Sequence, residues 1–263
     1  MIKISPDTKF SYNLIKGSVS SRQKYASNLN QQVFDSLELS MKGNSSQVSD
    51  LENTICEVLP EDKNIKILKN ANKNVDGASA YLYDNNENII GQTLEIPVKK
   101  GKFGTKVLVT VMHELTHIFD SLSNPKYISR ACLMTKQGKY NNSFNRWYEG
   151  VLYAEEKYKT ENDKKKCLKI VKDKTEKFLK GKSPEEKLNY IQDARYTLET
   201  ERNAHNEQLK YAKILDSQHK EIYDTDLEDC DKVYLFTEKI NLLKQMGLDT
   251  VSEIRKTQKK RCH

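Results

Sequence analysis

The stretch TKVLVTVMHELTHIFDSLSN, residues 105–124, decides how the rest of the chain is interpreted. Its apolar side chains recur at helical spacing, at Leu108, Val111, Met112, Leu115, Ile118, Phe119 and Leu122. Asn124 and Pro125 follow, and the residue before a proline is restricted toward extended conformations. The stretch therefore predicts an amphipathic helix over residues 105–122 with a broad apolar face.

This predicted helix contains the run HELTH at residues 113–117, which matches the pattern HExxH. Residues four apart lie on one face of a helix, so His113 and His117 can direct two imidazole nitrogens at one metal ion. Glu114 stands next to the first histidine and can take a proton from metal-activated water. Because zinc acidifies water and polarises a substrate carbonyl, we predict zinc ligands at His113 and His117 and a general base at Glu114.

The composition indicates a polar protein without a cysteine framework. The chain has 263 residues, 37% hydrophobic and 31% charged, with a formal net charge of +7. Its lysines are spread along predicted helices among glutamates, so we interpret them as solvated helix faces and predict no nucleic-acid partner. Its five cysteines are odd in number and contain no CxxC pair, which argues against disulfides and against a cysteine zinc site.

The first residues, MIKISPDTKFSYNLIKG, contain neither a continuous apolar run nor a cleavage-site pattern, so we expect no secretory signal peptide. No window approaches the roughly 18 apolar residues of a membrane-spanning helix, so we predict no membrane partner. These features predict a cytoplasmic protein. They leave open an export route that needs no cleaved signal.

The remaining pattern predicts an α+β fold rich in helix. Further helices are expected over residues 20–41, 48–59 and 141–180, from Ser183 past Ala212, and as a final pair over 227–247 and the C-terminal tail. Strands are expected over residues 65–68, 80–83 and 89–98, forming a small antiparallel sheet on the HELTH helix. Pro97 indicates that the third strand is an edge or ends there.

Residues that commonly start and end helices support these boundaries. Gly181 is expected to close one helix, and Ser183 with Glu186 forms a capping box that starts the next, with Pro184 in its first turn. We divide the chain into an N-terminal helical segment (1–60), a core (61–218) and a C-terminal helical segment (219–263).

The run VLVTVMHELTHIFD resembles the active-site helix of the zincin metallopeptidases. Metzincins carry a third histidine six residues past the second, and snapalysin-type enzymes carry an aspartate there, whereas this chain has Ser123. The resemblance therefore implies a gluzincin-like zincin, whose core sheet packs on the HExxH helix and whose third zinc ligand is a glutamate on a later helix.

The favoured third ligand is Glu201. Its predicted helix carries an apolar stripe at Ile191, Ala194, Leu198, His205, Leu209 and Ala212. By steps of about 100°, Glu201 lies at the edge of that stripe, while Glu199 points away. A carboxylate beside an apolar stripe requires a partner, and zinc is a suitable one. The spacing Glu199-x-Glu201-x-x-Ala204 is also similar to the third-ligand helix of lethal-factor-type zincins, which carry an aspartate at the position of Asp120.

Alternatives to Glu201 stay open. The run WYEG at 147–150 resembles the third-ligand run of aminopeptidase-like gluzincins, with one residue fewer between Trp and Glu. This makes Glu149 the second candidate, although it points away from the apolar stripe of its own helix, and Glu155 is a further candidate.

Other residues are candidates for supporting roles. His205 lies one turn from Glu201 and could donate to an oxyanion, as could Tyr196 or Tyr148. Asp120 could hydrogen-bond a ligand histidine. Each of these residues also fits an ordinary structural role. Thermolysin-like gluzincins have an aspartate at the position of His205, so the resemblance supports the superfamily more than any one family.

These observations predict a zinc metalloendopeptidase that hydrolyses peptide bonds in a protein or peptide, with Zn²⁺ as cofactor. The alternatives are a non-catalytic zincin-like binding module, a secreted effector or toxin protease with one target, and a helical nucleic-acid-binding or scaffold protein in which HELTH is accidental.

Overall fold

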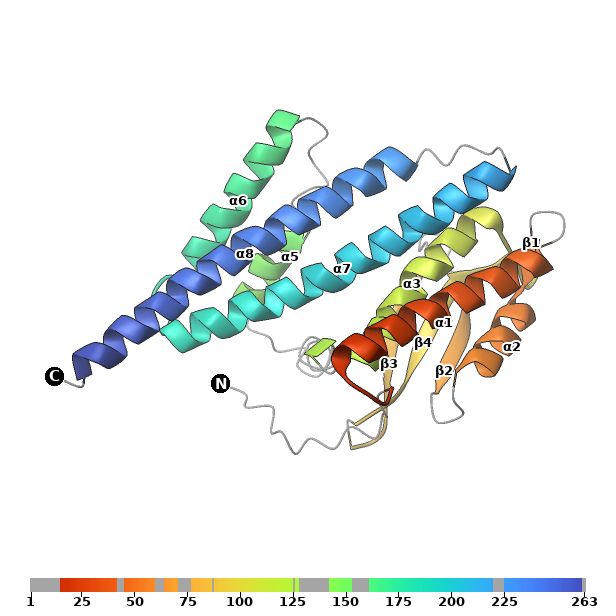
Figure 1. Ribbon diagram of the computed structural model, residues 1–263, viewed down its shortest axis with the longest axis horizontal. Coiled ribbons are helices and arrows are strands. Elements are labelled where there is room, and N and C mark those ends of the chain that lie inside the picture. Colours follow the sequence, from red (N-terminus) through yellow and green to blue (C-terminus); the bar gives the residue numbers. More distant parts are fainter. Residues whose placement is uncertain are drawn as a thin grey trace. The chain divides into compact units, whose positions relative to one another are not determined.

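The computed structural model describes residues 15–41, 45–59, 64–70, 77–86, 88–124, 126–127, 142–152, 161–219 and 225–261 (Figure 1). Within these ranges the helices are α1 (Val19–Ser40), α2 (Val48–Val58), α3 (Thr105–Ser123), α5 (Asn142–Leu152), α6 (Glu161–Leu179), α7 (Pro184–His219) and α8 (Thr225–Arg261). The strands are β1 (Ser45–Gln47), β2 (Ile65–Asn70), β3 (Ala78–Tyr83), β4 (Ile89–Pro97) and β5 (Lys102–Gly104). The predicted helix-rich α+β class is confirmed.

The chain forms two compact units, which we describe separately. The first unit comprises Met1–Ala131 and Asn203–Asp229, and the second comprises Cys132–Arg202 and Cys230–His263. Two of the divisions between the units fall inside helices, one after Arg202 in α7 and one after Asp229 in α8, and both helices run unbroken through them. The three segments expected from the sequence, 1–60, 61–218 and 219–263, stay a prediction.

The first unit contains two small sheets. In the larger one β4 lies between β2 and β3, parallel to β2 and antiparallel to β3, while β1 and β5 form an antiparallel pair. The expectation of an all-antiparallel sheet is therefore wrong for β2. The turn at 84–88 fixes only the β3–β4 hairpin, in which Asp84 accepts hydrogen bonds from the backbone of Asn86 and Asn88.

A close backbone contact places β2 on the other side of β4. Gln92 donates its backbone N–H to the carbonyl oxygen of Asn64 at 2.9 Å. A Cβ atom at Gly91 would overlap that same oxygen, so only glycine permits this approach. β4 ends at Pro97, as the sequence predicts, but it is the central strand of its sheet rather than an edge.

α3 is the central helix of the first unit. All seven apolar residues of its predicted stripe are buried, which confirms the amphipathic pattern. The helix contacts α1, β3, β4 and β5, and Figure 1 shows α1 beside it. The C-terminal half of α7 belongs to the same core, where Tyr211 stacks on Phe34 of α1 with ring centroids 4.3 Å apart. Burial raises the pKa of the Tyr211 hydroxyl well above its ordinary value.

The second unit is a helical assembly of α5, α6, α8 and the first half of α7. Trp147 of α5 stacks on Phe178 of α6 and donates its indole N–H to the Thr175 hydroxyl at 3.1 Å. The fully buried Lys239 of α8 donates from Nζ to the carbonyl oxygen of Leu152 at 2.9 Å, which satisfies a carbonyl at the end of α5.

In the second unit, one predicted helix end is confirmed and another is wrong. Gly181 adopts φ 78° after α6, as expected of a helix-ending glycine. The expected final helical pair is instead the single helix α8, which passes through Gly247. Gly247 is buried, and a Cβ atom there would make ordinary contact with Leu188 and Ile191 of α7. Packing therefore offsets the modest helix-breaking tendency of this glycine.

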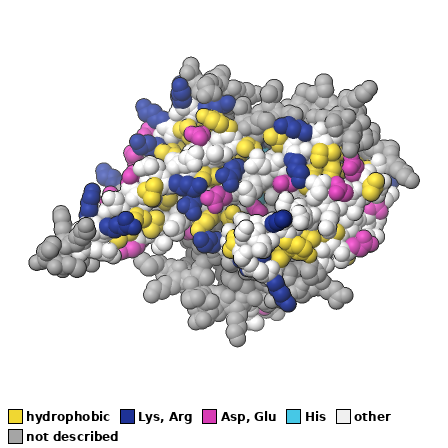
Figure 2. Space-filling view, viewed as in Figure 1, with side chains coloured by type: hydrophobic (Ala, Val, Ile, Leu, Met, Phe, Trp, Pro, Cys, Tyr) yellow, Lys and Arg dark blue, Asp and Glu magenta, His cyan; other side chains and the backbone are white. Residues whose placement is uncertain are grey.

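On the face drawn in Figure 2, Lys and Arg side chains are scattered among acidic and hydrophobic ones and form no single patch. Among the described helices none is both long and apolar enough to cross a membrane.

Candidate metal centre

The two motif histidines face each other across one turn of α3. The Nε2 atoms of His113 and His117 lie 3.2 Å apart, and both side chains are half-buried. Two nitrogens bound tetrahedrally to zinc at about 2.0–2.1 Å would lie roughly 3.3 Å from each other. The observed separation fits a shared tetrahedral metal ion, and it equally fits a hydrogen bond between the two imidazole rings.

A glutamine from α7 orients the first of these histidines. The Nδ1 atom of His113 lies 2.8 Å from Oε1 of Gln208. With the Gln208 amide assigned in this orientation its oxygen accepts, which assigns the proton of His113 to Nδ1 and a lone pair to its Nε2, toward His117. Histidines that bind metals usually donate their second N–H in this way. Gln208 was not among the residues predicted from the sequence, although it lies on the face of α7 that carries Glu201 and His205, at spacing i, i+4 and i+7.

α7 also supplies a carboxylate and a third imidazole. His113, Glu201 and His205 each offer one ligand atom within 4.8 Å of the others, and all three are half-buried. The His205 ring lies edge-on to the His113 ring, with centroids 4.7 Å apart. Glu201 precedes the unit boundary by two residues, but the unbroken α7 carries it one turn before His205. Among the described residues, the group of three donors that could hold one metal ion is His113, Glu201 and His205, and His117, one of the two ligands predicted from the motif, is not part of it.

The predicted general base lies where β3 begins. Glu114 is half-buried, and its Cγ would lie 3.4 Å from a Cβ atom added at Gly77, the residue before β3. That added Cβ would lie only 2.8 Å from Cγ2 of Thr110 on α3. The absence of a side chain at Gly77 therefore lets the end strand of the β2-β4-β3 sheet approach α3 beside Glu114.

The other predicted residues lie in different surroundings. Asp120 accepts a hydrogen bond from the side-chain amide of Asn203 at 2.9 Å. Glu149 is exposed on α5, whereas its neighbour Tyr148 is buried in the core of the second unit. Tyr196 packs against the guanidinium of Arg195, 5.0 Å from its ring centroid. The third-ligand candidate Glu155 lies outside the described residues.

The donor set around His113 determines what the centre can bind. Imidazole nitrogens with one carboxylate suit zinc and other late first-row metals, and they do not form the oxygen-only sites that calcium and magnesium prefer. The residues present therefore fit a zinc ion.

Comparisons of the chain with family models, with curated proteins and with solved structures found no match.

Proposed function

We propose that this chain is a zinc-dependent metallopeptidase of the zincin type, in which His113, His117 and Glu201 hold the metal and Glu114 is the general base. The observation that carries the proposal is the 3.2 Å separation of the two histidine Nε2 atoms. It is supported by the Gln208 contact, which leaves a lone pair on His113 Nε2, and by the carboxylate of Glu201, which belongs to one donor group with His113 and His205.

A zinc ion held there would supply Lewis acidity toward water and toward a substrate carbonyl. The Glu114 carboxylate accepts a proton from the attacking water and delivers it to the leaving amine. Gln208 keeps His113 in the tautomer that donates from Nδ1. His205 lies in the same donor group and is the residue best placed to donate a hydrogen bond to an oxyanion.

The position of β3 supports a peptide as substrate. β3 is an end strand of its sheet, and among the described strands it pairs only with β4. An extended peptide can add to such an edge through main-chain hydrogen bonds. Because Gly77 brings the start of β3 beside Glu114, a peptide on this edge would pass close to the general base.

The test is a Glu114→Gln variant, with Glu52→Gln on the exposed surface of α2 as its matched control. We expect both variants to retain zinc. We expect Glu114→Gln to lose peptide hydrolysis by about a hundredfold or more, because general base catalysis contributes roughly 10²–10⁴ in rate. The readout is mass spectrometry of a peptide library incubated with each protein.

Turnover by Glu114→Gln at the rate of the control would contradict the mechanism. A zinc-loaded wild type that cleaves no peptide of the library would favour the non-catalytic binding module.

A further inference from the structure

The positive charge of the chain is concentrated in its second unit. That unit contains 25 Lys and Arg against 16 Asp and Glu, whereas the first unit contains 19 Lys and Arg against 21 Asp and Glu. The formal charges are therefore +9 for the second unit and −2 for the first, which together give the +7 of the whole chain. A negatively charged partner is therefore attracted to the second unit.

Most of the exposed side chains of α6 are lysines. Seven lie along α6 and the turn after it: Lys165, Lys166, Lys169, Lys172, Lys174, Lys177 and Lys180. From residue 164 to residue 180, the exposed carboxylates are those of Asp173 and Glu176. Lys172 lies 3.9 Å from Glu176, and because both side chains are 56% exposed, this pair contributes little. Lys177 and Lys180 form no salt bridge with any described residue, so α6 presents an excess of positive charge.

A groove lies in the second unit between α6, the first half of α7 and α8, and we call it the α6–α8 groove. Its volume is about 720 Å³. Its floor consists of four aliphatic side chains, those of Leu179, Ile191, Leu242 and Met246. The first two are buried in the core of the second unit, and the other two are half-buried against that core. The groove therefore offers a recessed apolar surface to a ligand.

The two walls of the groove differ in charge. The α6 wall contains three lysines, among them Lys177 and Lys180, beside two carboxylates. The α8 wall contains the carboxylates of Asp249 and Glu253 and no basic residue. Glu253 lies 3.4 Å from Lys187 of α7 in an exposed salt bridge. A ligand in the groove therefore meets an excess of positive charge on the α6 side and negative charge on the α8 side.

These features select a polypeptide among the negatively charged partners. Single-stranded nucleic acids in a protein groove stack their bases on aromatic side chains, and none of the described residues that line this groove is aromatic. Helices that bind a membrane surface insert protruding apolar side chains, whereas Leu179 and Ile191 at the floor are only 5% and 2% exposed. Side chains that project from a helix reach such a recessed floor.

We propose that the α6–α8 groove binds an amphipathic helix of a protein partner, with the apolar face of that helix on the floor and its acidic flank against α6. Three helices that line a concave apolar groove leave the position of a fourth helix in a bundle. Along α8 the groove runs from Leu242 to Glu253, about 16 Å at roughly 1.5 Å per residue, which is the length of three helical turns. The lysines of the α6 wall attract the acidic flank and the carboxylates of the α8 wall repel it, so the charges fix the orientation of the partner helix.

The experiment is a fluorescence anisotropy titration of a labelled synthetic helix with the full-length chain. The probe has about 18 residues, because shorter isolated helices are marginal in water. Its leucines recur at spacing i, i+4 and i+7, glutamates form one flank, and glutamines form the other. One control peptide has glutamine in place of every glutamate, and a second has the composition of the probe with its leucines scrambled around the helix. We expect saturable binding of the probe, binding of the neutral peptide about tenfold weaker, and no saturable binding of the scrambled peptide.

Three variants locate the binding. We expect Lys177→Glu with Lys180→Glu to weaken the probe about tenfold, because two attractive contacts at the α6 wall become repulsive. Lys165→Glu with Lys169→Glu makes the same change of charge on exposed residues of α6 outside the groove, so it should bind nearly as the wild type does. Met246→Gln should weaken the probe because it makes the floor polar. Thermal melting followed by circular dichroism checks that each variant is folded.

The inference is overturned if the probe shows no saturable binding, or if the scrambled peptide binds as tightly. It is also overturned if the two double variants weaken the probe equally, or if Met246→Gln binds it like the wild type. Tighter binding of a DNA duplex, or of vesicles containing phosphatidylserine, would replace the helix with that partner. Dimerisation of the chain that the probe reverses would replace it with a second copy. None of these results depends on zinc binding or peptidase activity.

Discussion

His113 is the residue around which the candidate metal centre is organised. Its Nε2 atom lies 3.2 Å from Nε2 of His117, and its Nδ1 atom lies 2.8 Å from Gln208. Its ring also packs edge-on against His205. The first partner comes from α3 itself and the other two come from α7, so the geometry of this imidazole depends on the packing of α7 on α3 within the first unit.

A test at the residue scale is Gln208→Leu. This change removes the acceptor for His113 Nδ1 while keeping a side chain of similar size. We expect the zinc dissociation constant to rise about 10- to 100-fold, the usual effect of losing such a supporting partner. Competition against a chromophoric chelator measures it. Gln208→Glu keeps an acceptor oxygen and should restore most of the affinity, whereas equal affinity in Gln208→Leu and wild type would show that the contact does not support the metal.

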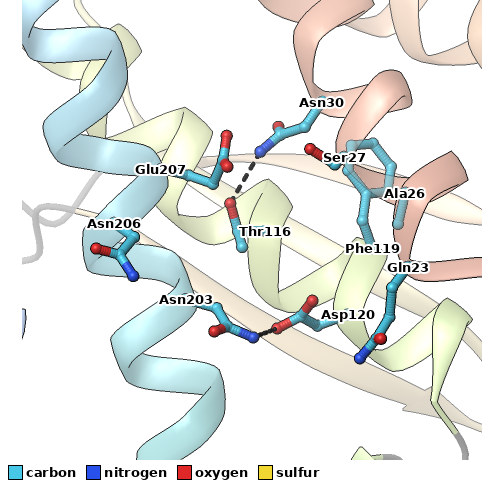
Figure 3. A pocket seen from close by; sticks show the side chains of 10 residues that line it. All are labelled: Gln23, Ala26, Ser27, Asn30, Thr116, Phe119, Asp120, Asn203, Asn206 and Glu207. Atoms are coloured by element: carbon cyan, nitrogen blue, oxygen red, sulfur yellow. Dashed lines mark hydrogen bonds between the residues drawn. The ribbon is translucent and has the colours of Figure 1, made fainter. Parts of the chain in front are cut away.

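The motif residues could be predicted and Gln208 could not, for a physical reason. His113 and His117 are four apart on one helix, so their shared face follows from local geometry alone. The contact between His113 and Gln208 joins residues 95 positions apart and depends on how two helices pack. Asp120 was a candidate either to hydrogen-bond a ligand histidine or to be a polar residue at a helix end; its carboxylate accepts a hydrogen bond from Asn203 of α7 (Figure 3), a contact that also depends on how helices pack.

At the scale of elements, two reciprocal hydrogen bonds between Ser183 and Glu186 cap the start of α7. The backbone N–H of Glu186 donates to the Ser183 hydroxyl at 3.2 Å, and the backbone N–H of Ser183 donates to the Glu186 carboxylate at 2.9 Å. This confirms the capping box expected from the sequence. The hydrogen bond from the Ser183 backbone is the main cause that holds the pKa of Glu186 below its ordinary value.

We therefore expect Ser183→Ala to lower the free energy of unfolding by about 1 kcal/mol, while Ser183→Thr keeps the cap. Because folding lowers the pKa of Glu186, its contribution is complete above the ordinary carboxyl pKa and is lost as the pH falls through the folded-state pKa. In Ser183→Ala the pKa of Glu186 should move only part of the way back toward its ordinary value, because the hydrogen bond from the side chain is lost while the hydrogen bond from the backbone N–H of residue 183 stays. Denaturant unfolding and NMR titration check both effects, and an Ala variant as stable as Ser183→Thr would contradict the cap.

Helices and strands were predicted correctly where the sequence pattern lies within a few neighbouring residues. They were predicted wrongly where contacts between distant segments determine the structure. The apolar stripe of α3 and the turn at 84–88 act over a few residues, and both predictions hold. The parallel pairing of β2 with β4 depends on the close approach of Asn64 to Gly91, which no local sequence pattern predicts. Likewise, Gly247 does not end a helix, because its buried face packs against α7.

At the scale of the molecule, α7 is one of two helices that contribute residues to both units, the other being α8. Its first half places Ile191, Ala194 and Leu198 in the core of the second unit. Its second half carries Tyr211 and Ala212, which are fully buried in the first unit. Glu201 and His205 lie between these two sets of buried residues. The candidate metal ligands of α7 are therefore held by a helix that is anchored by buried side chains on both sides of them.

The most direct test of the zinc site is the metal content of the purified chain by elemental analysis, beside His113→Ala, His117→Ala, Glu201→Ala and His205→Ala. We predict one zinc ion per wild-type chain, retained in His205→Ala and lost in the other three variants. Zinc lost in His205→Ala and retained in His117→Ala would move the metal to the donor group formed by His113, Glu201 and His205. A folded wild type that takes up no zinc when zinc is offered would contradict the metal centre itself.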